Sequence, residues 1–141
     1  MRFTTRGRYA LRASLALAKL SKDGKPISIS RLSETEDISP VFLEQIFYKL
    51  RKAGVVESIR GPGGGFCFSR ALEKINLKEI LDAAGEDLNL TLCNKKKKQC
   101  SREKECISHQ VLMEMTNTIK DYFSCLSLAS VIEKYDAKFK K

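Results

Sequence analysis

The chain has 141 residues, of which 43% are hydrophobic and 30% charged, so it can form one folded domain with an appended element. No apolar run approaches the roughly 18–20 residues of a membrane helix, and the basic N-terminus lacks the apolar stretch of a secretory signal, which excludes both classes. The formal net charge is +9, and the first 80 residues carry fifteen basic and eight acidic side chains. Such a surface suits a polyanion, most commonly nucleic acid.

Three helices are predicted in the first part of the chain, at about residues 5–20, 28–36 and 39–53. The third has the strongest start, Ser39-Pro40, because the serine oxygen accepts a free N–H and proline fits the first helical position. Gly54 follows its end, where a left-handed residue is favoured. Two helices joined by a short turn predict a helix-turn-helix over about residues 28–51.

The third predicted helix has one apolar and one mixed face. The apolar face, expected in the core, consists of Leu43, Ile46, Phe47 and Leu50. The opposite face carries Val41, Glu44, Gln45, Tyr48 and Lys52. A helix with a polar outer face after a short turn is typical of a helix that reads nucleic acid.

A glycine-rich turn divides two short runs of strand-forming residues. Val55–Arg60 precedes the turn Gly61–Gly65, and Phe66–Ser69 follows it, which predicts a β-hairpin. A hairpin directly after the helix-turn-helix is a wing, here over about residues 55–69. The fold class is therefore mainly α with a small β-hairpin wing. Inward-pointing Phe66 and Phe68 would send Cys67 outward, where it could be oxidised.

The second half of the chain contains helices and a cysteine-rich segment. Asn76 and Glu79 form a capping-box pattern for a helix that ends at Gly85. We assign residues 1–85 to a DNA-binding domain, and residues 86–141 to a cysteine loop and dimerisation helices. A later helix of about twenty residues carries an apolar line, which predicts homodimerisation, with packing inside one chain as the alternative. This line consists of Ile107, Val111, Met115, Ile119, Tyr122 and Leu126.

Three cysteines and the only histidine follow the spacing Cys93-x6-Cys100-x5-Cys106-x2-His109. Thiolates with an imidazole suit zinc or an iron–sulfur cluster, and the spacing is close to that of an RNA-binding zinc finger. A zinc-binding RNA-binding protein is therefore one alternative. The five cysteines are an odd number without a secretory signal, which argues against a disulfide scaffold. No catalytic constellation is present, so we expect no enzyme.

Four segments resemble the IscR/NsrR/CymR family of bacterial winged helix-turn-helix transcription regulators. These segments are Met1–Ala10, Phe42–Ile46, Leu50–Val56 and the wing sequence Arg60–Phe66. The likeness covers essentially the whole chain, and the Arg-Gly-Pro-Gly-Gly-Gly wing is its most specific part. The resemblance implies a cytoplasmic homodimer that binds double-stranded promoter DNA and represses or activates transcription.

The cysteine pattern is most similar to the IscR branch of that family. The resemblance implies a 2Fe–2S cluster held by Cys93, Cys100, Cys106 and His109 and supplied by the iron–sulfur assembly machinery. It also implies a regulator, expected to repress, of cluster assembly or related iron and redox genes. The gap between the first two cysteines is six residues rather than that branch's five.

Two other metal centres remain as alternatives. The nitric-oxide-sensing branch of the family holds a 4Fe–4S cluster with an aspartate whose position is Arg8 here. A nitric-oxide or redox-responsive regulator with such a cluster is therefore an alternative function. Zinc is the other alternative metal.

The resemblance also implies which residues contact DNA. Glu44 and Gln45 match positions that meet base edges, and Arg60 matches a wing arginine that enters the minor groove. Val41 lies where the IscR branch has a DNA-contacting serine. Phosphate contacts are expected from Arg2, Thr5, Arg6 and Arg8. The remaining expected contacts are Ser39, Tyr48, Gly61 and Pro62.

Overall fold

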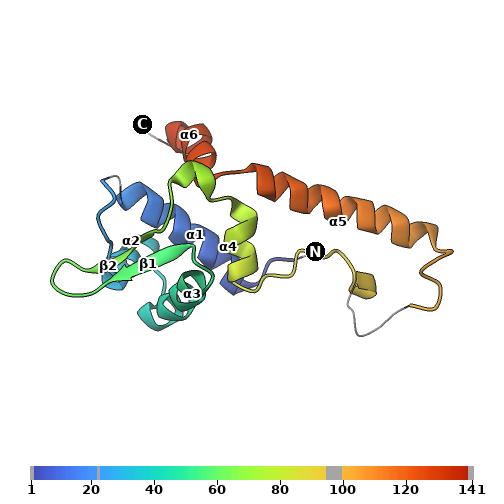
Figure 1. Cartoon of the computed structure of the whole chain (residues 1–141), viewed down its shortest axis with the longest axis horizontal. Coiled ribbons are helices and arrows are strands. Elements are labelled where there is room, and N and C mark those ends of the chain that lie inside the picture. The colour runs from blue at the N-terminus through green and yellow to red at the C-terminus, as the bar shows by residue number, and fades with distance from the viewer. Residues whose placement is uncertain (1, 22, 95–99, 140–141) are drawn as a thin grey trace.

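The computed structural model describes residues 2–21, 23–94 and 100–139, which form a helical body and one projecting helix (Figure 1). The body contains α1 to α4, a two-stranded hairpin and α6, while α5 extends away from it. The α-helices are α1 (Thr5–Leu20), α2 (Ile29–Glu36), α3 (Pro40–Lys52), α4 (Leu77–Ala83), α5 (Ile107–Cys125) and α6 (Leu128–Phe139). The strands are β1 (Val56–Ile59) and β2 (Gly65–Phe68), and two short 3-10 turns are η1 (Leu72–Lys74) and η2 (Leu92–Asn94). The predicted class, mainly α with a β-hairpin wing, is confirmed.

The predicted helix caps explain where the helices of the body begin. The Ser28 side chain accepts the Arg31 N–H at 3.1 Å, and Ser39 accepts the Phe42 N–H at 3.4 Å. Asn76 and Glu79 form both hydrogen bonds of a capping box at α4. These bonds satisfy N–H groups that have no partner inside a helix, which is why polar residues precede each helix.

The core lies between α1, α2, α3 and α4 and includes one residue of α6. Leu17, Leu32 and Leu43 are fully buried in it, and Leu128 at the start of α6 is also fully buried. The predicted apolar face of α3 therefore packs into this core. A salt bridge of 2.9 Å between Lys19 and Asp136 also joins α6 to α1.

The hairpin packs on the body through the aromatic residues of β2. β1 and β2 pair antiparallel, and the Phe66 ring lies 5.0 Å from the Phe47 ring of α3. A Cβ on Gly65 would lie 2.2 Å from the Ile27 carbonyl oxygen, so only glycine fits where β2 passes this backbone.

The prediction that Cys67 faces solvent is wrong, because its side chain is only 9% exposed. Alternation along a strand determines the face to which a side chain points, but not how much the rest of the chain covers that face. Burial raises the pKa of the Cys67 thiol, and the negative charge of Glu57 raises it further.

The predicted long helix is confirmed as α5, which has 19 residues. It is about 28 Å long at a rise of 1.5 Å per residue. Residues 86–92 run from the end of α4 to the start of η2 beside this helix (Figure 1). No helix within the described residues is long and apolar enough to cross a membrane.

Candidate nucleic-acid interface and cysteine segment

The outer face of α3 is exposed along its whole length. Val41 is 64% exposed and Tyr48 is 55% exposed, and Glu44 and Gln45 between them are also exposed. These four residues and Lys49 line one surface hollow. Lys49 was not among the predicted contacts, although its position four residues after Gln45 on a helix could have indicated it.

The opposite face of α3 is fixed in the core, which makes the exposed face a rigid platform. Leu43, Phe47 and Leu50 are completely buried. Ser39, a predicted DNA contact, uses its oxygen as the N-cap of this helix. Because the helix is packed in this way, the Cα atoms of its exposed residues are held in fixed positions. Recognition of a base edge requires such positioning.

The N-terminal arm, residues 2–8, lies at the start of α1. Arg2, Thr5 and Arg8 are exposed and line a hollow of about 660 Å³ together with Phe3 and Thr4. Arg6 is placed differently, because its guanidinium donates to the Gly85 carbonyl at 3.4 Å and its Nε atom is buried without a partner in the described structure. Three of the four predicted phosphate-contacting residues therefore face solvent.

The wing ends in an exposed glycine turn. Arg60, Gly61 and Pro62 are all exposed. Gly61 has a φ of 104°, and a Cβ on Gly64 would lie 2.2 Å from the Ile59 carbonyl oxygen, so the turn requires glycine. The compact turn allows Arg60 and Pro62 to project from the body.

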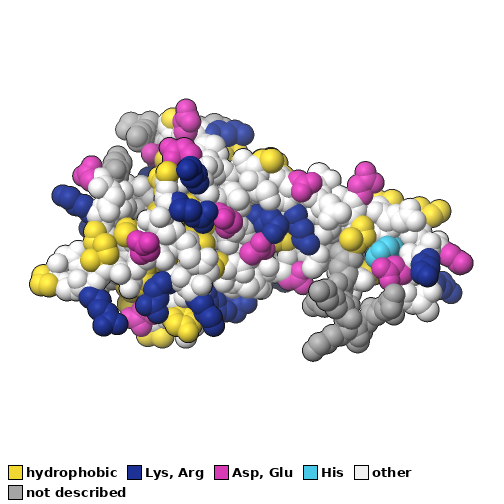
Figure 2. Space-filling model, in the orientation of Figure 1, with side chains coloured by type: hydrophobic (Ala, Val, Ile, Leu, Met, Phe, Trp, Pro, Cys, Tyr) yellow, Lys and Arg dark blue, Asp and Glu magenta, His cyan; other side chains and the backbone are white. Residues whose placement is uncertain are grey.

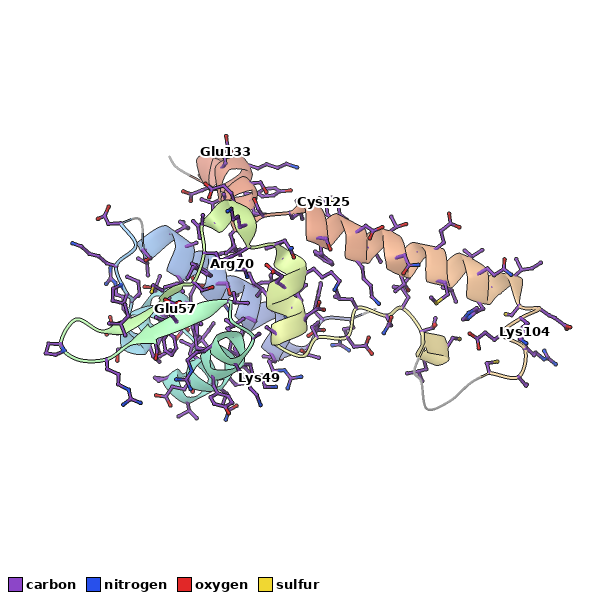
Figure 3. The ribbon with its side chains drawn as sticks, viewed as in Figure 1. Lys49, Glu57, Arg70, Lys104, Cys125 and Glu133 are labelled. Carbon is purple, nitrogen blue, oxygen red and sulfur yellow. The ribbon has the colours of Figure 1, made fainter. Side chains whose placement is uncertain are left out.

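Positive charge gathers around α3 and the hairpin, along the lower edge of the view in Figure 2. The last turn of α3 contains Lys49, Arg51 and Lys52. Lys49 lies on the side of the body opposite Glu133 of α6 in Figure 3. Such a distribution favours a polyanion on the α3 side.

The predicted metal ligands lie along one segment, but their side chains are not gathered into one site. Cys93 is in η2, Cys100 is exposed in the loop before α5, and Cys106 is the N-cap of α5. The His109 N–H donates to the Cys106 sulfur at 3.4 Å. No three His, Cys, Asp or Glu side chains in the described part of the chain lie close enough together to hold a metal ion.

The chemistry of these four side chains nevertheless fits a cluster or zinc. The three thiols are free of disulfides, and His109 Nε2 lies 3.6 Å from the Glu103 carboxylate. Residues 95–99, between the first two cysteines, are outside the described residues. Cys125 lies at the other end of α5, far from the loop that holds Lys104 (Figure 3), and thus apart from this set.

The apolar line predicted for dimerisation is largely exposed on α5. Ile107 is 79% exposed, and Val111, Met115 and Tyr122 are each about half exposed. Val111, Met115 and Ile119 line a shared hollow. Leu126 differs from the others, since it packs against the core of the body.

Comparisons with known proteins agree with this architecture. A sequence profile of the Rrf2 family, described as iron-dependent transcriptional regulator, matches residues 3–134. A protein of Neisseria meningitidis named as an HTH-type transcriptional regulator is 41% identical over 134 residues, which cover 95% of this chain and 89% of that protein. The HTH-type transcriptional regulator IscR of Erwinia tasmaniensis is 35% identical over 136 residues, covering 96% and 81%.

The fold is also similar to that of solved structures. The solved structure of T. potens IscR matches with a TM-score of 0.78 at 23% identity, and the match covers all of this chain and 93% of that one. The family profile and the relatives extend over the helix-turn-helix, the wing and α5 together. The chain therefore belongs to the Rrf2 family of transcriptional regulators.

Proposed function

We propose that this IscR-like regulator reads promoter DNA with the outer face of α3, and that an iron–sulfur cluster on its cysteine segment controls this binding. The observation that carries the proposal is the exposed face of α3, whose opposite face is locked in the core. Its targets are genes of iron–sulfur cluster assembly or related iron and redox genes, with repression as the expected effect. The protein then acts in the cytoplasm, where promoter DNA is present.

Two side chains on α3 have the chemistry to distinguish bases in the major groove. A glutamate such as Glu44 accepts from the amino group of cytosine, and a glutamine such as Gln45 forms paired hydrogen bonds with adenine. Val41 has an apolar side chain, which suits contact with the methyl group of thymine. A double-stranded operator is therefore expected to have specified bases at neighbouring positions under α3.

Other parts of the body would hold the phosphate backbone. The exposed Arg2, Thr5 and Arg8 at the start of α1 and the half-buried Lys49 of α3 would supply donors for phosphate oxygens. Arg60, Gly61 and Pro62 project on the wing, where Arg60 would enter the minor groove. The phosphate contacts position the protein but carry no sequence information.

A homodimer joined along α5 would present two such surfaces. Half-sites in its operator should then be separated by about one helical turn, roughly 34 Å, or a multiple of it. The exposed apolar residues of α5 support this assembly, because an exposed apolar line on a helix marks an interaction surface.

Cys93, Cys100, Cys106 and His109 would hold the cluster, with 2Fe–2S as the proposed type and 4Fe–4S or zinc as alternatives. When bound, an iron–sulfur cluster supplies a centre whose charge and stability respond to oxidants. Gathering these ligands requires the cysteine loop to close, because the described side chains are not grouped at one point. Cys106 and His109 already lie on one turn at the start of α5.

The function is tested by measuring the base preference of an α3 variant. Glu44→Ala should relax the preference at one position of each half-site by about 1–3 kcal/mol between correct and incorrect bases. The matched control is Glu133→Ala on α6, which removes the same charge from the other side of the body. Both variants are titrated with an operator selected from random DNA and with single-base changes in it.

The affinities of the two variants for the operator and its single-base changes test whether α3 reads the sequence. Loss of discrimination at one position in Glu44→Ala alone supports reading by α3. Unchanged base preferences in Glu44→Ala would show that another surface reads the sequence.

A further inference from the structure

Glu86 lies three residues after the end of α4, and its acidic side chain is placed in the interior. It is only 7% exposed. Its Oε1 atom accepts the Thr4 backbone N–H at 3.0 Å, and its Oε2 atom accepts the Thr4 hydroxyl at 2.5 Å. Both carboxylate oxygens are therefore bonded to a residue that is 82 positions away in the sequence.

These bonds complete a capping box whose two halves come from distant parts of the chain. Thr4 is the N-cap of α1, and its hydroxyl oxygen accepts the Gly7 N–H at 3.1 Å. In an ordinary capping box the third helical residue returns a glutamate to the N-cap N–H. That residue here is Gly7, which has no side chain, and Glu86 supplies the missing carboxylate.

Gly7 and Glu86 fit each other sterically. A Cβ on Gly7 would lie 2.2 Å from Oε2 of Glu86 and 2.7 Å from its carboxyl carbon. Glycine is unfavourable inside a helix, so its presence at this position requires a reason. The close approach of the carboxylate provides that reason.

The start of α1 is also attached to the rest of the protein at two further points, one beside the end of α4 and one on α5. Arg6 donates to the carbonyl of Gly85, the neighbour of Glu86, and the Phe3 ring lies 6.0 Å from the ring of Phe123 on α5. The exposed Arg2 and Arg8 of the N-terminal arm are thus held by the end of α4 and by α5. Their position depends on contacts that are remote in sequence.

Glu86 also begins the strap, residues 86–92, that leads to Cys93. Leu88 in this strap is 3% exposed, and the Leu90 N–H donates to the buried Thr116 hydroxyl at 3.3 Å. Lys120 of α5 donates to the Asn89 side chain at 3.0 Å. The strap is therefore fixed along α5 between Glu86 and the first cysteine.

We propose that Glu86 is a positioning residue for DNA binding, which holds the N-terminal arm in place and links it through the strap to the cysteine segment. The inference rests on the proposed function, since it assumes that the arm contacts phosphate. A carboxylate close to a DNA-binding arm repels DNA, so a role for Glu86 in affinity must come from positioning. If Glu86 acts by positioning, removing its charge should weaken DNA binding. A purely electrostatic role would instead strengthen binding.

The first test compares Glu86→Gln with Asp82→Asn, using the metal-free protein and a duplex of arbitrary sequence. Both changes remove one negative charge, but Asp82 is an exposed residue of α4 that pairs with Lys78. Asp82→Asn should bind equally well or more tightly. Glu86→Gln should bind about tenfold more weakly, and its salt dependence should be shallower by about one unit for each phosphate that the displaced arm no longer reaches. If Glu86→Gln binds as tightly as Asp82→Asn, the positioning role is wrong.

A second variant displaces the carboxylate without changing any charge. Gly7→Ala places a methyl group 2.2 Å from the present position of Oε2, too close for both to remain in place, so it should weaken binding to the same duplex, as Glu86→Gln does. Helix propensity alone predicts the opposite, a better-formed α1. Circular dichroism checks that each variant keeps its helices. Wild-type affinity in a folded Gly7→Ala protein would contradict the inference.

A measurement without DNA separates this inference from the proposed function. Trypsin cleavage after Arg6 and Arg8 should be faster in Glu86→Gln than in the wild type or Asp82→Asn, because the start of α1 is released. If the wild type binds no duplex while cleavage behaves as expected, the proposed function fails and the attachment of the arm stands. Equal cleavage rates in all three proteins would overturn the attachment itself.

Discussion

The helical body buries its apolar side chains, whereas α5 leaves most of its apolar line exposed. In the body, Leu17 and Leu128 are completely buried. On α5, Ile107, Val111 and Met115 are exposed, and the only buried residue of the helix is the polar Thr116. The body can therefore be stable by burying its own apolar surface, whereas the exposed apolar line of α5 would be buried only in the proposed dimer. The same kind of sequence pattern thus supports folding in the body and, in our proposal, assembly along α5.

The largest expected effect concerns the cysteine segment at the free end of α5. Cys106→Ala should abolish the visible absorbance of anaerobically purified protein, because it removes a proposed cluster ligand. Cys125→Ala, at the other end of α5, is the matched control and should keep the absorbance. Iron and sulfide analysis accompanies both spectra. Full iron and sulfide in Cys106→Ala would contradict the ligand assignment, and colourless protein containing zinc would contradict the cluster.

The next effect concerns the apolar line of α5. Met115→Asp should convert dimers into monomers, because an unpaired charge buried in an interface costs about 3–5 kcal/mol at each of two symmetric positions. Asn117→Asp is the control, since residue 117 is exposed on another side of the helix. Sedimentation at micromolar concentration measures the change. A wild-type protein that is already monomeric would remove the proposed role of α5.

A smaller effect is expected in the body. Leu128→Ala should reduce the free energy of unfolding by about 2–5 kcal/mol, because it leaves a cavity in a packed core. Ile107→Ala should change it by less than about 0.5 kcal/mol, since the residue is exposed in the isolated chain. Urea unfolding of both changes in the monomeric Met115→Asp protein makes the comparison. Equal losses for the two residues would show that the two regions do not differ in this way.

The smallest effect concerns Cys67 in the hairpin. Because burial and Glu57 raise the pKa of this thiol, less thiolate is present near pH 8 and alkylation should be slower than at the exposed Cys125. The rate should increase with pH, and Glu57→Gln should increase it at constant pH. The folded state holds the thiol proton more tightly, so stability falls as pH rises through the raised pKa and is unaffected near neutrality. Peptide mapping by mass spectrometry measures the alkylation of both thiols. Equal alkylation rates for Cys67 and Cys125 would contradict the raised pKa of Cys67.

Local signals predicted most of the fold. Ser39-Pro40 and the Asn76–Glu79 pair identified helix starts, because a capping bond joins residues only two or three positions apart. The glycine turn of the wing was predictable for a similar reason, since its conformation depends on the residues of the turn itself. The face of α3 that leaves the core followed from helical periodicity, although Lys49 on that face was missed.

The sequence alone therefore determined the order of the elements, the two faces of α3 and the apolar line of α5, because spacing along a chain sets which side chains share a face. Tertiary structure decided what covers Cys67, where the guanidinium of Arg6 points, and which carboxylate completes the cap of α1. The bond between Thr4 and Glu86 joins residues separated by 82 positions. No local pattern contains such a pair, since only the packing of α1 against α4 brings it together.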